Sequence, residues 1–346
     1  MSKISANLGS QKPLGSVKMA AVGAAAGTQA ESPSDPADSV SARRKELWSV
    51  LGDLPWTHRP APPRLLKTEK QDGYTLERLV LDLNGEEDVP ALLLIPEKRQ
   101  TRAPGMLYIH WHGGMYDLGK EQLLTGVPAQ PAYAPVLAEK GIVTLAIDSW
   151  CFGERKRVAD GRTGEEDAFK RMLWKGQVLF GMMMFDEFCG LDYLVSRPEV
   201  DPRRCGVLGM SMGATKAWWL AALDPRVSAC MDVCCLTDFE ELLRTQELKA
   251  HGIYYYVPRL LQHFQTAQIN ELIVPRPHLS LNGRLDPLTP PAGVEKVRDQ
   301  LLPLYRKLGC EQNCEISLYD CAHVELPAMR KRILQWMDKY LVAAPT

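Results

Sequence analysis

The segment Gly209-Met-Ser-Met-Gly213 contains the residues whose types and spacing most clearly predict chemistry. It lies between an apolar run at 204–209, which predicts a strand, and an alanine-rich run at 214–223, which predicts a helix. A serine on such a sharp strand-to-helix turn projects its hydroxyl from the sheet. Glycine on both flanks removes side chains that would collide with neighbouring backbone. We therefore predict that Ser211 is a nucleophile.

A serine nucleophile needs a base and a carboxylate that orients the base, in the chain order serine, acid, histidine. His323 follows the last predicted strand and precedes the last predicted helix, so it can reach the serine turn. Asp286 follows the preceding strand through a glycine turn, and its predicted role is to hold His323 in the reactive tautomer. Asp232 and Asp238, which follow the strand before that, stay open as alternatives for the acid.

Backbone N–H groups are the expected donors to the oxyanion that forms when a serine attacks a carbonyl. One predicted donor is Met212, the residue after the nucleophile. The other predicted donor is Gly114, in the segment His110-Trp-His-Gly-Gly114 that follows the predicted strand at 106–109.

Two groups of residues could be interpreted as metal ligands. His110 and His112 follow a strand at a spacing that some metallohydrolases use, and Cys310 and Cys314 are four residues apart. Neither pair is followed by a second set of ligands at matching spacing. The sequence therefore predicts a site with neither a metal ion nor a cofactor.

Short apolar runs predict strands, and longer periodic runs predict helices between them. The predicted strands lie at 75–83, 89–95, 106–109, 143–147, 205–208, 229–233, 278–281 and 315–319. The predicted helices lie at 135–140, 185–195, 215–223, 294–308 and 326–342. The first two strands are expected to form an antiparallel hairpin, and the later ones are apolar enough for a buried parallel sheet. This alternation predicts an α/β fold with a mostly parallel, doubly wound sheet and helices on both faces.

The chain is expected to contain one domain. Residues 1–40 are rich in Ser, Ala, Gly and Pro, which predicts a flexible low-complexity tail, and residues 41–342 form the predicted catalytic domain. Insertions at about 152–184 and 236–273 follow strand ends and interrupt the pattern. Loops at the carboxyl ends of parallel strands build the binding crevice, so both insertions are expected to form caps over it.

A basic run in the first insertion has two interpretations. Arg155, Lys156 and Arg157 could recognise a carboxylate or a sugar acid, or they could form a solvated surface. The sequence favours the solvated surface.

The composition restricts the partners of the protein. The 346 residues include 41 basic and 42 acidic ones, so the net charge of −1 gives no reason to expect nucleic acid. No run approaches the roughly 18 apolar residues that span a bilayer. The nine cysteines lie mostly in apolar tracts, which favours reduced thiols and a cytoplasmic location. Secretion is the alternative, because residues 18–30 faintly imitate a signal peptide. A small molecule is the expected partner, and a homo-oligomer stays open.

Four tracts together resemble bacterial α/β-hydrolases related to dienelactone hydrolases and to acetyl xylan esterase-like enzymes. The tracts are His110-Trp-His-Gly-Gly114, Gly209-Met-Ser-Met-Gly213, Pro277-His-Leu-Ser-Leu-Asn-Gly-Arg-Leu-Asp-Pro-Leu-Thr-Pro290 and Cys321-Ala-His323. The resemblance covers roughly residues 41–342 and is strongest from residue 201 onward. It implies an α/β-hydrolase fold with Ser211 as nucleophile, Asp286 as acid and His323 as base. True dienelactone hydrolases use cysteine as the nucleophile, so the serine here speaks against lactone chemistry.

These observations predict a serine esterase. The enzyme would cleave carboxylic esters of small molecules, with acetyl or other short acyl groups and sugar esters included, through an acyl-enzyme. A peptidase of the prolyl-oligopeptidase kind and a non-catalytic, ligand-binding protein of the same fold are the alternatives. The chain contains no amino-terminal region of propeller size, which disfavours the peptidase.

Overall fold

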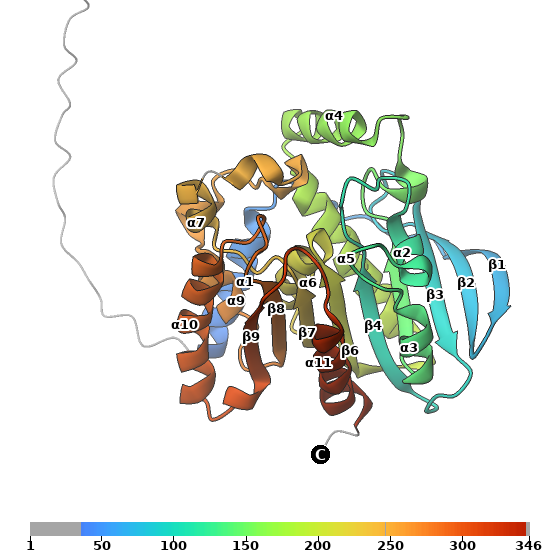
Figure 1. Ribbon diagram of the computed structural model, residues 1–346. Coiled ribbons are helices and arrows are strands. Elements are labelled where there is room, and N and C mark those ends of the chain that lie inside the picture. Colours follow the sequence, from blue (N-terminus) through green and yellow to red (C-terminus); the bar gives the residue numbers. More distant parts are fainter. Residues whose placement is uncertain (1–35, 246, 344–346) are drawn as a thin grey trace, which may run out of the picture.

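The computed structural model describes residues 36–245 and 247–343 (Figure 1). Residues 1–35 of the predicted tail lie outside the described residues. Helix α1 (Pro36–Ser49) begins inside the segment 1–40 that was predicted to be the tail, so the folded part starts a few residues earlier than expected. Proline is tolerated in the first turn of a helix, so this residue does not delay the start.

The nine-stranded sheet has the order β1-β2-β3-β5-β4-β6-β7-β8-β9. The three pairings that join β1, β2, β3 and β5 are antiparallel, and the remaining pairings are parallel. The strands are β1 (Arg64–Gln71), β2 (Tyr74–Leu81), β3 (Val89–Pro96), β4 (Ala103–Ile109), β5 (Val143–Ile147), β6 (Val200–Met210), β7 (Val227–Val233), β8 (His278–Gly283) and β9 (Cys314–Tyr319). This is the mostly parallel sheet that the sequence predicted.

Strand β1 was not predicted from the sequence. It is an edge strand whose residues are almost all exposed. Apolar and polar residues do not alternate in it, because Leu65 and Leu66 are adjacent and the rest is polar or charged. An edge strand paired on one side and solvated on both faces carries little of the period-two pattern from which strands are predicted.

Helices cover both faces of the sheet, as Figure 1 shows. The helices are α1 (Pro36–Ser49), α2 (Gln122–Thr125), α3 (Ala134–Glu139), α4 (Gly161–Trp174), α5 (Leu179–Ser196), α6 (Met212–Leu223), α7 (Phe239–Thr245), α8 (Leu260–His263), α9 (Thr266–Glu271), α10 (Pro291–Lys307) and α11 (Pro327–Met337). The larger core cluster contains side chains of α1, α5, α6 and α10, and the smaller cluster contains side chains of α3 and α11.

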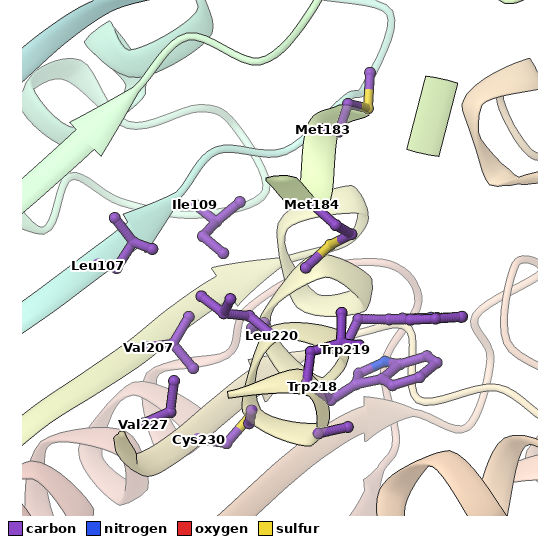
Figure 2. Close-up of a cluster of buried hydrophobic side chains, with 14 of the residues drawn as sticks. Leu107, Ile109, Met183, Met184, Val207, Trp218, Trp219, Leu220, Val227 and Cys230 are labelled. Atoms are coloured by element: carbon purple, nitrogen blue, oxygen red, sulfur yellow. The ribbon is translucent and has the colours of Figure 1, made fainter. Parts of the chain in front are cut away.

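Helix α6 is buried along its whole length, and its first residue follows Ser211 directly. Figure 2 shows Trp218, Trp219 and Leu220 of this helix in one buried apolar cluster with Leu107 and Val207 of the sheet. The two tryptophans are at most 1% exposed. Burying large aromatic side chains removes much apolar surface from water, so the packing of α6 fixes the helix whose amino terminus carries the predicted nucleophile.

A buried ion pair ties α6 to α5. Lys216 Nζ lies 2.6 Å from Glu187 Oε1, and the two side chains are 0% and 1% exposed. The same ammonium group donates a hydrogen bond to the Ser149 hydroxyl, just after β5. Because both charges are out of water, each depends on its partner for compensation.

Removing one partner of this pair should destabilise the protein far more than removing both. We expect Glu187→Leu to lower the free energy of unfolding by about 3–5 kcal/mol, because the Lys216 charge is then buried without compensation. The double variant Lys216→Met/Glu187→Leu should recover most of that loss. Urea denaturation of the three proteins measures this. A double variant no more stable than Glu187→Leu would contradict the assigned coupling.

Candidate active site

Ser211 lies on a strained turn between β6 and α6, with φ 59° and ψ −118°. Its N–H donates to Val233 O at 2.9 Å. A Cβ on Gly209 would lie 2.3 Å from the backbone of Gly213, and a Cβ on Gly213 would lie 2.1 Å from Ile109 O. Only glycine can occupy these two positions without moving the backbone. The structure thus places Ser211 on the sharp strand-to-helix turn that the sequence predicted.

Asp286 and His323 come from neighbouring loops at the carboxyl edge of the sheet. Asp286 follows β8 and His323 follows β9, and Asp286 Oδ2 lies 2.7 Å from His323 Nδ1. The carboxylate is buried, and its other oxygen accepts the Leu288 N–H at 2.9 Å. Gly283 allows the loops to approach, because a Cβ there would lie 2.4 Å from Ala322 O. The acid and base predicted from the sequence are therefore paired.

Ser211 and His323 line one pocket of about 520 Å³. His323 Nε2 is buried and has no hydrogen-bond partner within the described part of the chain. The Trp111 ring lies nearly parallel to the His323 ring, at 15° and 6.5 Å between centroids. Because Asp286 engages Nδ1, Nε2 is the ring nitrogen of His323 that remains for another group.

The alternative acids are bound to other groups. Asp232 is fully buried and accepts hydrogen bonds from His278 Nε2 at 2.8 Å and from the Ser280 hydroxyl at 2.6 Å. Asp238 accepts from the Glu241 N–H at 3.0 Å and from Lys296 Nζ at 2.9 Å. These two carboxylates contact helix and strand residues, whereas Asp286 contacts His323.

Cys235 is a pocket residue that the sequence analysis did not identify. Its thiol is hydrogen-bonded to the hydroxyls of Ser211 and Thr289. Burial raises the pKa of the Cys235 thiol far above its usual range, and these hydrogen bonds only partly offset the effect. The thiol therefore stays protonated near neutral pH, which disfavours it as a nucleophile.

His110 is committed to the protein interior. Its Nδ1 donates to Trp111 O at 2.8 Å, and its Nε2 accepts the Ser149 N–H at 3.0 Å. Burial, followed by the nearby Lys216 charge, lowers the pKa of His110 to about 3, so the ring stays neutral. Both ring nitrogens are occupied, which disagrees with the interpretation of His110 and His112 as shared metal ligands.

The cysteine pair also lacks a metal-binding geometry. Cys310 Sγ contacts Tyr305 O at 3.4 Å. Two groups of three residues in the described part of the chain have ligand atoms within 4.8 Å of one another, and they contain neither Cys310 nor His112. One of them joins Cys234 to Asp286 and His323. Burial raises the pKa of the Cys234 thiol well above its usual range, so the thiol is protonated in the metal-free protein.

The two predicted oxyanion donors differ in their surroundings. Met212 is the first residue of α6, where helix N–H groups have no partner within the helix. The Gly114 N–H donates to Nδ1 of the His112 ring at 3.1 Å, so it is already engaged. The assignment of both donors stays a prediction.

Residues from both insertions line the pocket. Helix α4 of the first insertion contributes Glu165, and the segment 248–256 of the second contributes Tyr254. In Figure 1, α4 lies at the top of the view, apart from the helices that flank the sheet. Glu165 carries no signal in the sequence, because it belongs to no motif and its contacts are distant along the chain. Tyr254 lies in the aromatic run Tyr254-Tyr-Tyr256, whose residue types fit either a pocket lining or core packing, and the structure places it at the pocket.

The basic run after β5 is not a uniform solvated surface, so that expectation is wrong for its first residue. Arg155 is 4% exposed. Its guanidinium lies 2.7 Å from the carboxylates of Glu87 and Asp186. Arg157 is exposed and pairs with Glu87. Arg155 is buried because it pairs with carboxylates from distant segments, Glu87 and Asp186 of α5, and the residue types alone do not encode that pairing.

The fold and the arrangement of these loops define an α/β-hydrolase. The parallel strands end at one edge, the serine turn follows the central strand β6, and the loops after β8 and β9 reach the same pocket. Among the described residues, no helix is both long and apolar enough to cross a membrane.

The chain belongs to the Abhydrolase family, whose model matches residues 36–288. It is 42% identical over 301 residues to "Putative hydrolase YtaP" of Bacillus subtilis (strain 168), which covers 86% of this chain and 99% of the relative. A glucuronoyl esterase from Solibacter usitatus has a similar structure, with a TM-score of 0.62 and 16% sequence identity. The superposition covers 88% of this chain and 94% of the esterase. Acetyl Xylan Esterase 1 from Thermoanaerobacterium sp. JW/SL YS485 has a TM-score of 0.60 and 16% sequence identity, over 88% of this chain and 94% of that enzyme. At these identities the two structures support the fold alone.

The close approach at the serine turn gives a direct test. We expect Gly213→Ala to lower the free energy of unfolding by about 3 kcal/mol, because the added methyl group meets rigid backbone and cannot be accommodated by a side-chain rotation. Gly73→Ala is the matched control, because φ is +81° there but no atom lies within 4 Å of the added Cβ. It should cost only about 1 kcal/mol. Chemical denaturation measures both, and equal losses would show that crowding at the turn is unimportant.

Proposed function

We propose that the protein is a serine hydrolase of carboxylic esters. The observation that carries the proposal is the hydrogen bond between Asp286 and His323 at the wall of the pocket that contains Ser211. A histidine held through Nδ1 by a buried carboxylate presents Nε2 to accept a proton, and the nearby serine hydroxyl is the group from which it would take one.

In the first half of the proposed reaction, the Ser211 oxygen attacks the ester carbonyl while His323 Nε2 takes the hydroxyl proton. The C–O bond to the alcohol then breaks, and His323 returns the proton to the leaving oxygen. The buried Asp286 carboxylate stabilises the imidazolium that forms between these steps. The products are a free alcohol and an acyl-enzyme on Ser211.

In the second half, water attacks the acyl-enzyme while His323 accepts one of its protons. Breakage of the bond to the Ser211 oxygen releases the carboxylic acid, and the proton returns to the serine. The backbone donors proposed for the oxyanion are those of Met212 and Gly114. Because the Gly114 N–H is bound to His112, it would have to exchange that acceptor for the substrate oxygen.

The size of the pocket and the relatives support a small-molecule ester as substrate. A volume of about 520 Å³ is within the usual range for small ligands. Two structurally similar proteins are named as a glucuronoyl esterase and an acetyl xylan esterase. We therefore propose esters with short acyl groups, sugar esters among them, as the substrate class.

Labelling with a fluorophosphonate probe tests the mechanism without knowledge of the substrate. We expect peptide mass spectrometry to find the adduct on Ser211 in the wild type, and none on this residue in His323→Ala, because the serine is activated only by its base. A folded wild-type protein that forms no adduct would overturn the proposal.

Replacing the Asp286 carboxylate with a neutral amide tests its proposed role as the acid of the site. We expect Asp286→Asn to lower kcat for p-nitrophenyl acetate by about 1,000-fold or more, because the neutral amide no longer selects the reactive tautomer of His323. Asp320→Asn is the matched control, since its carboxylate lies in the loop of His323 but its side chain is 89% exposed. The control should keep wild-type kcat. An equal effect in both variants would remove Asp286 from its proposed role.

Substrate classes separate the esterase from the peptidase of the same fold. We expect turnover of acetyl and butyryl p-nitrophenyl esters and none of dipeptide amides under the same conditions. Cleavage of the amides at a comparable kcat/KM would favour the peptidase instead.

A further inference from the structure

A hydrogen-bonded relay links cap helix α4 to the glycine turn that follows β4. Glu165 on α4 is buried, with a side chain that is 2% exposed. Its Oε2 accepts the Tyr116 hydroxyl at 2.8 Å and lies 3.1 Å from His112 Nε2. At the other side of the same ring, His112 Nδ1 lies 3.1 Å from the Gly114 nitrogen. The ring therefore joins a carboxylate in the first insertion to a backbone amide at the pocket.

The chemistry of the two contacts fixes the tautomer of His112. A backbone N–H can only donate, so Nδ1 must be unprotonated to accept the Gly114 N–H. The neutral ring then carries its proton on Nε2, which faces the Glu165 carboxylate, a group that only accepts when ionised. Glu165 thus stabilises the one neutral tautomer that can hold Gly114.

The turn that receives this bond has an unusual backbone. Gly113 and Gly114 have φ values of 49° and 71°. The Met115 N–H donates to His112 O at 2.9 Å and closes the turn, and the ring contact adds a second constraint on it. A two-glycine turn is permissive, because glycine adopts many conformations at similar energy. Side-chain bonds are therefore needed to hold one of them.

Residues of the second insertion pack against the His112 ring and hold it in place. Tyr254 stacks on the ring at 5.5 Å between centroids and 27° between planes. A Cβ on Gly252 would lie 2.9 Å from His112 Nε2, so the chain packs closely on the edge of the ring. These contacts restrict movement of the His112 ring. The main freedom that remains is which ring nitrogen carries the proton, and the Glu165 carboxylate favours Nε2.

We propose that Glu165 is a positioning residue that, through His112, fixes the turn 112–115 at the pocket. The inference rests on the proposed function, because that turn carries the predicted loop donor to the oxyanion. When the oxyanion forms, the Gly114 N–H exchanges His112 for the substrate oxygen, and a turn already held in one conformation needs only this local exchange. Misplacing the turn therefore lowers kcat and leaves KM nearly unchanged. If the relay instead withheld the Gly114 N–H from the substrate, breaking it would raise kcat.

A mutant cycle tests the proposal. We expect Glu165→Ala to lower kcat for p-nitrophenyl acetate, and the rate of phosphonylation of Ser211, by about tenfold or more, with KM changed by less than about twofold. Glu165→Gln keeps an oxygen that accepts from Nε2 and should retain activity to within about threefold. Asp167→Ala, an exposed position on the same helix whose side chain is 53% exposed, is the matched control and should match the wild type.

The second part of the mutant cycle uses a variant, His112→Asn, in which Glu165 should no longer matter. In His112→Asn, the amide oxygen can accept the N–H of the residue two positions on without help from a carboxylate. Adding Glu165→Ala to His112→Asn should therefore cause no further loss of kcat. Melting temperatures identify any variant that has lost its fold. A Glu165→Ala protein with unchanged or raised kcat, or a full additional tenfold loss in the double variant, would overturn the proposal.

Nitrogen-15 NMR of the histidine rings tests the relay independently of catalysis. The His112 signals are those that disappear in His112→Asn. We expect Nε2 to be protonated and Nδ1 to be an acceptor in the wild type, and a mixture of both tautomers in Glu165→Ala. A wild-type ring protonated on Nδ1 would overturn the inference. If esters and fluorophosphonate are both inert, the proposed function fails, and the NMR result still decides whether Glu165 sets the tautomer.

Discussion

Ser211 keeps its strained backbone because helix α6 packs directly against the end of strand β4. The contact distance leaves no room for a side chain at Gly213, whose position is set by the Ile109 carbonyl. A positive φ at a serine costs about 1–3 kcal/mol, so this backbone conformation persists only where the surrounding packing holds it in place. The complete burial of α6 provides that constraint. The remaining parts of the site are arranged around this fixed hydroxyl.

Polar side chains beneath the site connect α6 to the loops that surround it. Lys216 contacts the Ser149 hydroxyl, and the Ser149 N–H binds His110, which in turn holds the Trp111 carbonyl. Each of these groups is paired within the protein, as buried polar groups must be to avoid a desolvation cost. The loop after β4, which stacks Trp111 on His323, is thereby connected to the helix that begins directly after Ser211.

A second buried network holds the turn after β7. Asp232 accepts from Ser280, whose hydroxyl oxygen accepts from the Asn282 amide. The Asn282 carbonyl oxygen accepts the N–H groups of Cys235 and Leu236 at 3.2 and 3.3 Å. This places the Cys235 sulfur beside the Ser211 hydroxyl. Asp232, which the sequence left open as the catalytic acid, instead joins β7 to β8 through this network.

The sequence by itself determined the parts that depend on near neighbours in the chain. The glycines around Ser211, the order of Ser211, Asp286 and His323, and the apolar parallel strands were all predicted, because the steric demands of a tight turn and the apolarity of a buried strand are local. Edge strand β1 lacked such a pattern. Only the tertiary structure decided that Arg155 is buried and that Glu165 meets His112, 53 residues away. Such pairs form because insertions fold over the sheet, and their partners are set by packing between distant segments, which local spacing does not encode.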